Sequence, residues 1–233
     1  MSLKSRIAPG LAAAAVAAAL LNAGAGLATA QTVTGWTGPT PPHDGVVYLH
    51  NSSVSNDSGI VAKSKLWTAT GQTVAPGYLA VRARLFKSGA LCDLAGYEFN
   101  TQWAASLEVA TSAGCGAGSY NSHGFIKVNS TSGTHEYVTF PSNPINYSGT
   151  ATARSAQANS EKPPTQTTSV GGKTYGPHNG SDPEAQPDYI AAYADSGRLG
   201  YVSNDSLDRA TKRGTQLTVV DQRGNKIGSL TVK

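Results

Sequence analysis

Residues 118–124 are the densest local group of side chains that can do chemistry. This stretch, GSYNSHG, holds hydroxyl groups next to an imidazole, the combination used in nucleophilic catalysis. Neighbouring residues of a strand point to opposite faces, so Ser122 and His123 do not form a natural pair, whereas Asn121 and His123 share a face. We therefore predict no catalytic residue here, and instead a binding patch formed by Tyr120, Asn121 and His123.

Carboxylates offer a second possible chemistry. A glycosidase needs two carboxyl groups about 5–10 Å apart to act as acid and base. Asp93 and Glu98 are close in sequence, but Asp93 follows a cysteine and Glu98 belongs to a strand-like segment, which favours a solvated edge. An extracellular hydrolase that uses Asp93, Glu98 and Glu108 is kept as an alternative function.

Known catalytic and metal-binding motifs are missing from the sequence. It contains no Gly-x-Ser-x-Gly, no His-Glu-x-x-His and no phosphate-binding loop. The five histidines are scattered, and the acidic segments 182–184 and 204–208 lack the glycine and distal glutamate of an EF-hand. We expect no metal site and no cofactor.

The first thirty residues have the pattern of a secretory signal peptide. Lys4 and Arg6 give a positive start, an apolar run covers residues 11–21, and the small residues 28–30 form a cleavage site before Gln31. This apolar run is too short to cross about 30 Å of hydrocarbon. We predict a secreted, extracellular protein with no membrane span after removal of residues 1–30.

Export decides how the two cysteines, Cys92 and Cys115, are interpreted. In an oxidising compartment such a pair is most simply one disulfide. Closing this loop contributes about 3 kcal/mol in the chain-entropy model. The alternatives are a catalytic thiol with a histidine, or half of a metal site; their small neighbouring residues and strand-and-turn surroundings favour neither.

Short β-like segments follow one another from residue 46 onward, separated by turns rich in Gly, Ser and Pro. Between residues 79 and 85 apolar residues alternate with Arg82 and Arg84, which indicates a strand with one apolar and one charged face. This spacing predicts a mainly β fold, an antiparallel sandwich or barrel. The predicted strands are 46–51, 60–68, 78–87, 106–111, 123–130 and 135–140.

Changes in composition divide the rest of the chain. Residues 148–168 contain no large apolar side chain and include Pro163-Pro164, as is typical of a linker. The following segment is too small to bury much apolar surface alone, so we expect it to lean on the first module. The predicted parts are a signal peptide (1–30), an extended Pro-rich arm (31–45), a β-sandwich-like domain (46–147), a linker (148–168) and a small C-terminal β module (169–233) with a hairpin of 217–220 and 226–232.

The charge distribution argues against a nucleic-acid partner. The formal charge of +4 includes Lys4 and Arg6, and without them 16 basic residues face 14 acidic ones. Residues 182–208 are rich in acids and residues 209–233 are rich in Lys and Arg, so the two segments neutralise each other when packed together. The basic segment has no aromatic residue on which a base could stack.

Two stretches resemble exported Gram-positive proteins. Residues 78–147 are similar to small secreted actinobacterial proteins of unknown role, through Ala83 to Phe86, Leu91-Cys92, and Cys115 to Tyr120 with Ser122 and Gly124. The C-terminal module resembles a short domain found in secreted and membrane-anchored Gram-positive proteins, through Gly172 to Gly176, Pro187 to Ile190, Gly200 to Val202, Val219 to Asp221 and Lys226 to Gly228. The resemblance implies a secreted β protein with one disulfide and transfers no catalytic residue.

These observations favour a secreted, non-enzymatic binding protein that attaches to a cell-wall polymer or to another secreted protein. Ten Tyr and three Trp suit a polar contact surface. Besides the hydrolase, a secreted inhibitor or antibacterial toxin component is a further alternative. In that case the cysteine-tethered loop 92–115 is the segment that contacts the target.

Overall fold

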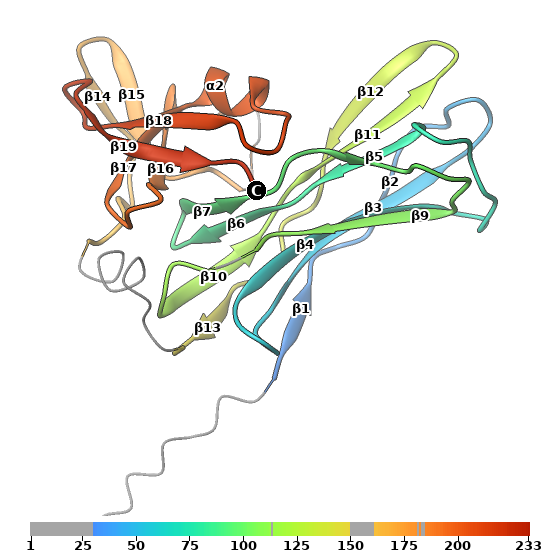
Figure 1. The fold of residues 1–233 in the computed structure, drawn as a ribbon, viewed down its shortest axis with the longest axis horizontal. Helices are drawn as coiled ribbons and strands as arrows, with labels where there is room; N and C mark the ends of the chain where they lie inside the picture. Colours follow the sequence, from blue (N-terminus) through green and yellow to red (C-terminus); the bar gives the residue numbers. More distant parts are fainter. Residues whose placement is uncertain (1–29, 113, 150–160, 181, 183–184) are drawn as a thin grey trace, which may run out of the picture.

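The computed structural model describes residues 30–112, 114–149, 161–180, 182 and 185–233. The predicted signal peptide therefore lies outside the described residues, apart from Ala30, as does the middle of the predicted linker. The described chain is mainly β, as the sequence predicts, and Figure 1 shows it as layered sheets. Its helix is the short α2 (Asn204–Arg209), and no helix in the described residues is long and apolar enough to cross a membrane.

A five-stranded sheet forms one layer of the sandwich. Its long hairpin of β3 and β4 follows the predicted alternation, with inward residues buried at every second position. The predicted arm is extended and adds two short strands to the edge of β3. The strands of this sheet are β1 (Thr32–Thr34), β2 (Gly38–Pro39), β3 (Tyr48–Ser55), β4 (Val61–Thr68) and β9 (Ser106–Ala110).

The opposite layer consists of a four-stranded sheet and part of a ten-stranded sheet. The four-stranded sheet contains β12 (Gly133–Val138), β11 (Phe125–Ser130), β5 (Leu79–Arg82) and β8 (Glu98–Phe99). Apolar side chains from both layers, including Tyr48, Leu66, Val81 and Ile126, pack together in the core between them.

The predicted strand over residues 78–87 is two strands. β5 pairs with β8 and β11 in one sheet, whereas β6 (Arg84–Lys87) pairs with β7 and β10 in the other, and the change occurs at Ala83. The segment that pairs with β5 and β6 also changes sheet at this level, where Gly124 lies between β10 and β11. A Cβ at Gly124 would clash with the carbonyl oxygen of Arg82, so only glycine fits there.

The ten-stranded sheet joins the predicted first module to the predicted C-terminal module. β7 pairs in parallel with β16, with Leu91 opposite Ala192. Figure 1 shows the C-terminal strands, orange to red, beside the green strands β6 and β7. The sheet comprises β13 (Ile145–Tyr147), β10 (Gly118–Ser122), β6, β7 (Ala90–Leu94), β16 (Tyr189–Tyr193), β17 (Leu199–Ser203), β18 (Gln216–Val220), β19 (Lys226–Thr231), β14 (Thr168–Val170) and β15 (Lys173–Gly176).

Further backbone hydrogen bonds hold the C-terminal half, which contains β14 to β19, against the first half, which contains β1 to β13. The amide of Lys233 donates to the carbonyl of Leu94 at 2.8 Å, and its carbonyl accepts from the amide of Gly96 at 2.8 Å. Apolar residues of both halves, among them Phe86, Leu91 and Ile190, share one hydrophobic core. The C-terminal half therefore packs on the first half as the sequence leads us to expect.

Candidate functional site

The predicted binding patch on β10 is mostly buried. Tyr120 belongs to the core, where its hydroxyl donates to the carbonyl of Gly116 at 2.6 Å and accepts from the amide of Cys115 at 2.9 Å. His123 is fully buried, and only Asn121 of the three predicted residues is partly exposed. Tyr120 and His123 therefore contribute to packing and hydrogen bonding inside the protein, and the three side chains form no common surface patch.

The hydroxyl of Tyr120 is expected to stabilise the protein measurably. Tyr120→Phe leaves a buried amide and a buried carbonyl without this partner, and we expect it to lower the free energy of unfolding by about 1–3 kcal/mol. Tyr147→Phe is the matched control, because the Tyr147 ring packs on Tyr120 but its hydroxyl makes no hydrogen bond within the described residues. Urea unfolding measures both variants, and equal stabilities would contradict the role assigned to Tyr120.

A cluster of cationic and titratable side chains is buried between the two halves. Arg82 and Arg84 are only 2% and 4% exposed, because the C-terminal half covers the charged face of their strands. Arg82 Nη2 donates to the carbonyl of Leu207 in α2 at 3.0 Å, and Arg84 Nε donates to the carbonyl of His123 at 3.2 Å. Among the described residues neither arginine forms an ion pair with a carboxylate.

Two histidines complete this buried cluster. His123 Nε2 lies 3.2 Å from His178 Nε2, and Arg84 Nη2 lies 3.2 Å from the former and 3.5 Å from the latter. Burial, and then the charge of Arg84, hold the pKa of both imidazoles far below the ordinary histidine value. Burial together with nearby Arg82 lowers the pKa of Arg84 to about 9. The histidines are therefore neutral, and they act as hydrogen-bonding links between the halves.

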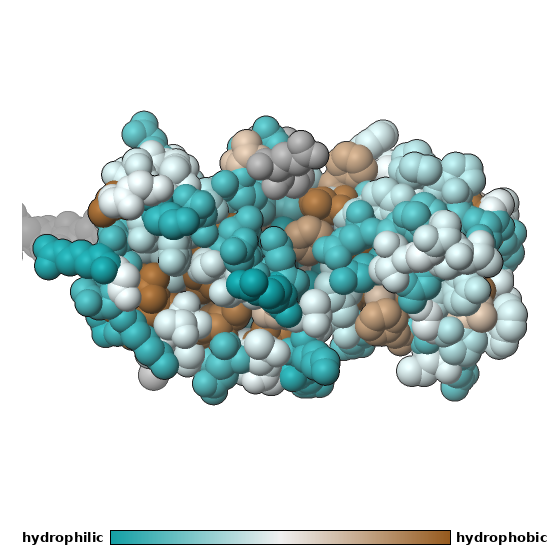
Figure 2. Space-filling model, turned by 90° about the horizontal axis from the view of Figure 1, so that it is seen from above, coloured by the Kyte–Doolittle hydropathy of each residue, from teal (hydrophilic) through white to brown (hydrophobic). Residues whose placement is uncertain are grey.

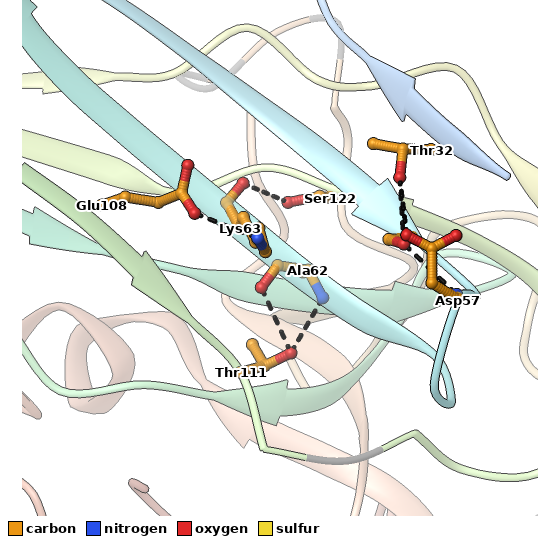
Figure 3. Close-up of polar contacts among 8 residues, drawn as sticks. Thr32, Asp57, Ala62, Lys63, Glu108, Thr111 and Ser122 are labelled. Carbon is orange, nitrogen blue, oxygen red and sulfur yellow. Dashed lines mark hydrogen bonds and ion pairs between the residues drawn. The ribbon is translucent and has the colours of Figure 1, made fainter. Parts of the chain in front are cut away.

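The three predicted carboxylates lie in three different sheets. Asp93 in β7 is buried, and its carboxylate accepts hydrogen bonds from the amide of Ser112 at 2.8 Å and its hydroxyl at 2.9 Å. Glu98 is exposed on β8, and Glu108 on β9 pairs with Lys63 at 3.1 Å, as Figure 3 shows. This arrangement gives no support to a paired-carboxylate mechanism.

Hydrogen bonds within its own sheet and across the sandwich hold β4 in place. Thr111 accepts from the amide of Ala62 at 3.0 Å, and Ser122 donates to the carbonyl of Lys63 at 3.2 Å (Figure 3). Ser122 thus uses its hydroxyl in a structural contact rather than toward His123. The described residues contain no group of three or more His, Cys, Asp and Glu side chains that could hold a metal ion.

The predicted disulfide between Cys92 and Cys115 is present and buried. It closes a loop with a sequence separation of 23 residues. This tethered segment, residues 92–115, carries two aromatic residues at the surface: Phe99 is 47% exposed and Trp103 is 68% exposed. These two rings leave apolar area in contact with water, and covering it with a ligand would be favourable.

Trp103 lines two shallow hollows of the surface. One, of about 250 Å³, is lined by Asp44, Val46, Tyr48, Thr73, Val74, Ala75, Tyr78 and Trp103. The other, of about 460 Å³, is lined by Glu98, Phe99, Asn100, Thr101, Gln102, Trp103, Ala104, Ser106 and Leu107. We call these two hollows, together with the Trp103 ring that lines both, the Trp103 surface.

Asn100 holds the loop of the Trp103 surface in a fixed shape. Its side-chain oxygen accepts from the amide of Leu79 at 2.8 Å, and its side-chain nitrogen donates to the carbonyls of Ala75 and Gln102, both at 2.8 Å. A backbone bridge between Val74 and Ala104 closes the loop on its other side. The tryptophan ring is therefore exposed on a rigid base, as a preorganised binding surface requires.

The residues of the Trp103 surface combine aromatic and aliphatic side chains with a smaller number of polar groups. Aromatic faces provide stacking area, while hydroxyl, amide and carboxylate groups around them can hydrogen-bond. Figure 2 shows one face of the molecule that is largely hydrophilic, with hydrophobic residues reaching it in small separate areas.

Sequence reasoning did not single out Phe99, Asn100 or Trp103. The available signal was a tryptophan within a polar stretch, Asn100 to Gln102, that fits no strand alternation. A large aromatic residue without a place in a periodic apolar face is a sign of exposure. No matching family model, similar curated protein or similar solved structure was found for this chain, so the candidate site rests on its own geometry.

Proposed function

We propose that the protein is a secreted, non-enzymatic binding protein that attaches to a cell-wall glycan through the Trp103 surface. The observation that carries the proposal is the exposed indole of Trp103, which lines two shallow hollows where apolar side chains and polar groups lie together. A sugar ring presents C–H groups on its faces and hydroxyl groups around its edge. Such a ring can stack on Trp103 and hydrogen-bond to the surrounding side chains.

The charges around Trp103 support one class of glycan over another. The residues that line the two hollows include the carboxylates of Asp44 and Glu98 and no Lys or Arg. Hydrogen bonds from Thr131 lower the pKa of Asp44, which keeps this carboxylate charged. Glycans that are neutral or bear amino groups are therefore favoured over phosphate-bearing wall polymers, which the carboxylates repel.

Trp103→Ala tests this proposal. We expect at least about tenfold weaker binding to insoluble peptidoglycan, which corresponds to about 1.4 kcal/mol, because the stacking surface is lost. The folded protein is expected to keep its stability, since Trp103 is exposed. Sedimentation of the protein with the insoluble polymer measures the bound fraction.

Trp36→Ala is the matched control, because Trp36 is 66% exposed and lines neither hollow of the Trp103 surface. It contacts Phe140 edge-on, with ring centroids 4.5 Å apart. We expect the glycan binding of this variant to equal that of the parent protein.

A second measurement tests the preference for neutral or amino-bearing glycans: walls stripped of phosphate polymers are expected to bind more protein than intact walls. An equal loss of glycan binding in the Trp103→Ala and Trp36→Ala variants, or binding only to a culture-fluid protein, would overturn the proposal.

A further inference from the structure

Both backbone polar groups of Gln31, its amide and its carbonyl, form hydrogen bonds with Asn56. The Gln31 amide donates to Asn56 Oδ1 at 2.6 Å, and the Asn56 amide donates to the carbonyl of Gln31 at 3.0 Å. β1 begins at the next residue, Thr32, which pairs with Ser55. Gln31 is therefore held at the edge of the sheet just before β1, and it directly follows the predicted cleavage site.

Cleavage before Gln31 turns its peptide nitrogen into an amine within reach of its own side chain. The side chain of Gln31 is exposed and makes no hydrogen bond within the described residues, so it is free to rotate toward this amine. Attack of the amine nitrogen on Cδ closes a ring of five atoms. A folded sheet that holds the nitrogen in place favours this intramolecular reaction over reactions with outside groups.

We propose that Gln31 is a modification site and becomes an amino-terminal pyroglutamyl residue after export, an inference that rests on the secretion part of the proposed function. The bond between the Gln31 nitrogen and Cδ forms, the bond between Cδ and Nε2 breaks, and one amine proton leaves with the departing amide nitrogen as ammonia. No oxidant, reductant or cofactor takes part.

The hydrogen bond to Asn56 belongs to the starting amine. In the product the nitrogen is a planar amide with one hydrogen that can still donate, but ring closure places Cδ on the side that now faces Asn56 Oδ1 and turns this hydrogen away from its present direction. Cyclisation also removes the positive charge of the amine. Asn56 is a positioning residue: its oxygen accepts one amine hydrogen while the nitrogen lone pair stays available for attack on Cδ.

Intact mass measurement of the full chain, secreted by a host that processes its signal, tests the inference. We expect the mass of residues 31–233 with the disulfide formed and one ammonia lost. Gln31→Asn is the matched control, since asparagine cannot form the five-atom ring from its own amine and should keep the full mass. A chain that starts at Gln31 with a stable free amine would overturn the proposed cyclisation and would leave the proposed glycan binding untouched. A chain that starts at another residue would overturn the predicted cleavage on which the cyclisation rests.

Asn56→Asp tests the positioning role. A carboxylate at residue 56 stabilises the protonated amine, so we expect several-fold slower loss of ammonia and a shift of the rate profile to higher pH. Incubation of freshly secreted protein across a pH series, followed by mass measurement, gives both quantities. An unchanged rate and an unchanged pH profile would exclude a role for Asn56, while thermal unfolding of the same samples reports whether the sheet edge is intact.

Discussion

The free energy of unfolding is expected to fall by about 3 kcal/mol between pH 6.5 and pH 4.5. His123 and His178 are neutral in the folded protein, because burial and the charge of Arg84 lower their pKa, for His178 to about 2. In the unfolded chain both imidazoles take up a proton below their ordinary pKa of 6.5. The unfolded state thus binds more protons, and stability is lost as the pH falls through this range.

The size of this effect follows from the number of protons involved. One histidine that stays neutral contributes about 1.4 kcal/mol per pH unit below its ordinary pKa. Two such histidines give an upper limit of about twice that value per pH unit. The partial exposure of His178 lowers its contribution, so the expected total loss of stability lies below this limit. The titratable groups that face the pair are Arg84 and, around Arg84, Arg82, Tyr97, Glu136 and Asp208.

Urea unfolding at a series of pH values measures this dependence. His178→Gln keeps a hydrogen-bonding side chain and removes one titrating group, so we expect its stability to change less steeply with pH. His135→Gln is the control outside the buried cluster, because His135 on β12 hydrogen-bonds with Ser130 and Ser132 and stacks on His43. If His178→Gln and the parent protein show the same slope, the buried cluster is not the source of the pH dependence.

Removal of the disulfide is expected to lower the free energy of unfolding by about 3 kcal/mol. Cys92 and Cys115 are 23 positions apart in the sequence, so the bond restricts a long loop in the unfolded chain. Both sulfur atoms lie in the core with Leu85, Tyr120 and other apolar side chains, where alanine leaves space unfilled. The expected fall in Tm of the Cys92→Ala/Cys115→Ala double variant is roughly 6–12 °C.

Thermal unfolding under oxidising and reducing conditions measures this contribution. The parent protein should lose stability in reductant, whereas the double variant should show the same Tm in both conditions. Because Asn100 and the Val74–Ala104 bridge hold the Trp103 loop independently of the disulfide, glycan binding of the folded double variant is expected to persist. An unchanged Tm in the double variant would show that the surrounding sheet alone restricts this loop.

The sequence predicted those elements whose pattern is local. The strands β3, β4, β9, β11 and β12 and the hairpin of β18 and β19 follow alternating segments bounded by turn residues, and all of them are confirmed within a few residues. The predicted strand at 78–87 is two strands, because the change of sheet at Ala83 depends on partners distant in sequence. The helix α2 spans six residues, which is too short for a 3.6-residue periodicity to be visible.

The candidate site was harder to predict than the fold. The alternation at Arg82 and Arg84 indicated a charged face, but not that residues more than a hundred positions later cover it. Arg84, His123 and His178 meet only because β6, β10 and the segment after β15 converge. The exposure of Trp103 likewise follows from the side chain of Asn100, whose hydrogen bonds depend on tertiary structure.

The parallel pairing of β7 with β16 has a consequence for the order of folding. Leu91 meets Ala192 only after the intervening residues have been synthesised and brought back, and such long-range pairing is slow compared with hairpin formation. Until then Phe86, Leu91 and Leu94 lack the side chains of the C-terminal half that pack on them. The first half therefore cannot complete its core while the later strands are absent. This delay in folding leaves time for export of a chain that must cross the membrane unfolded.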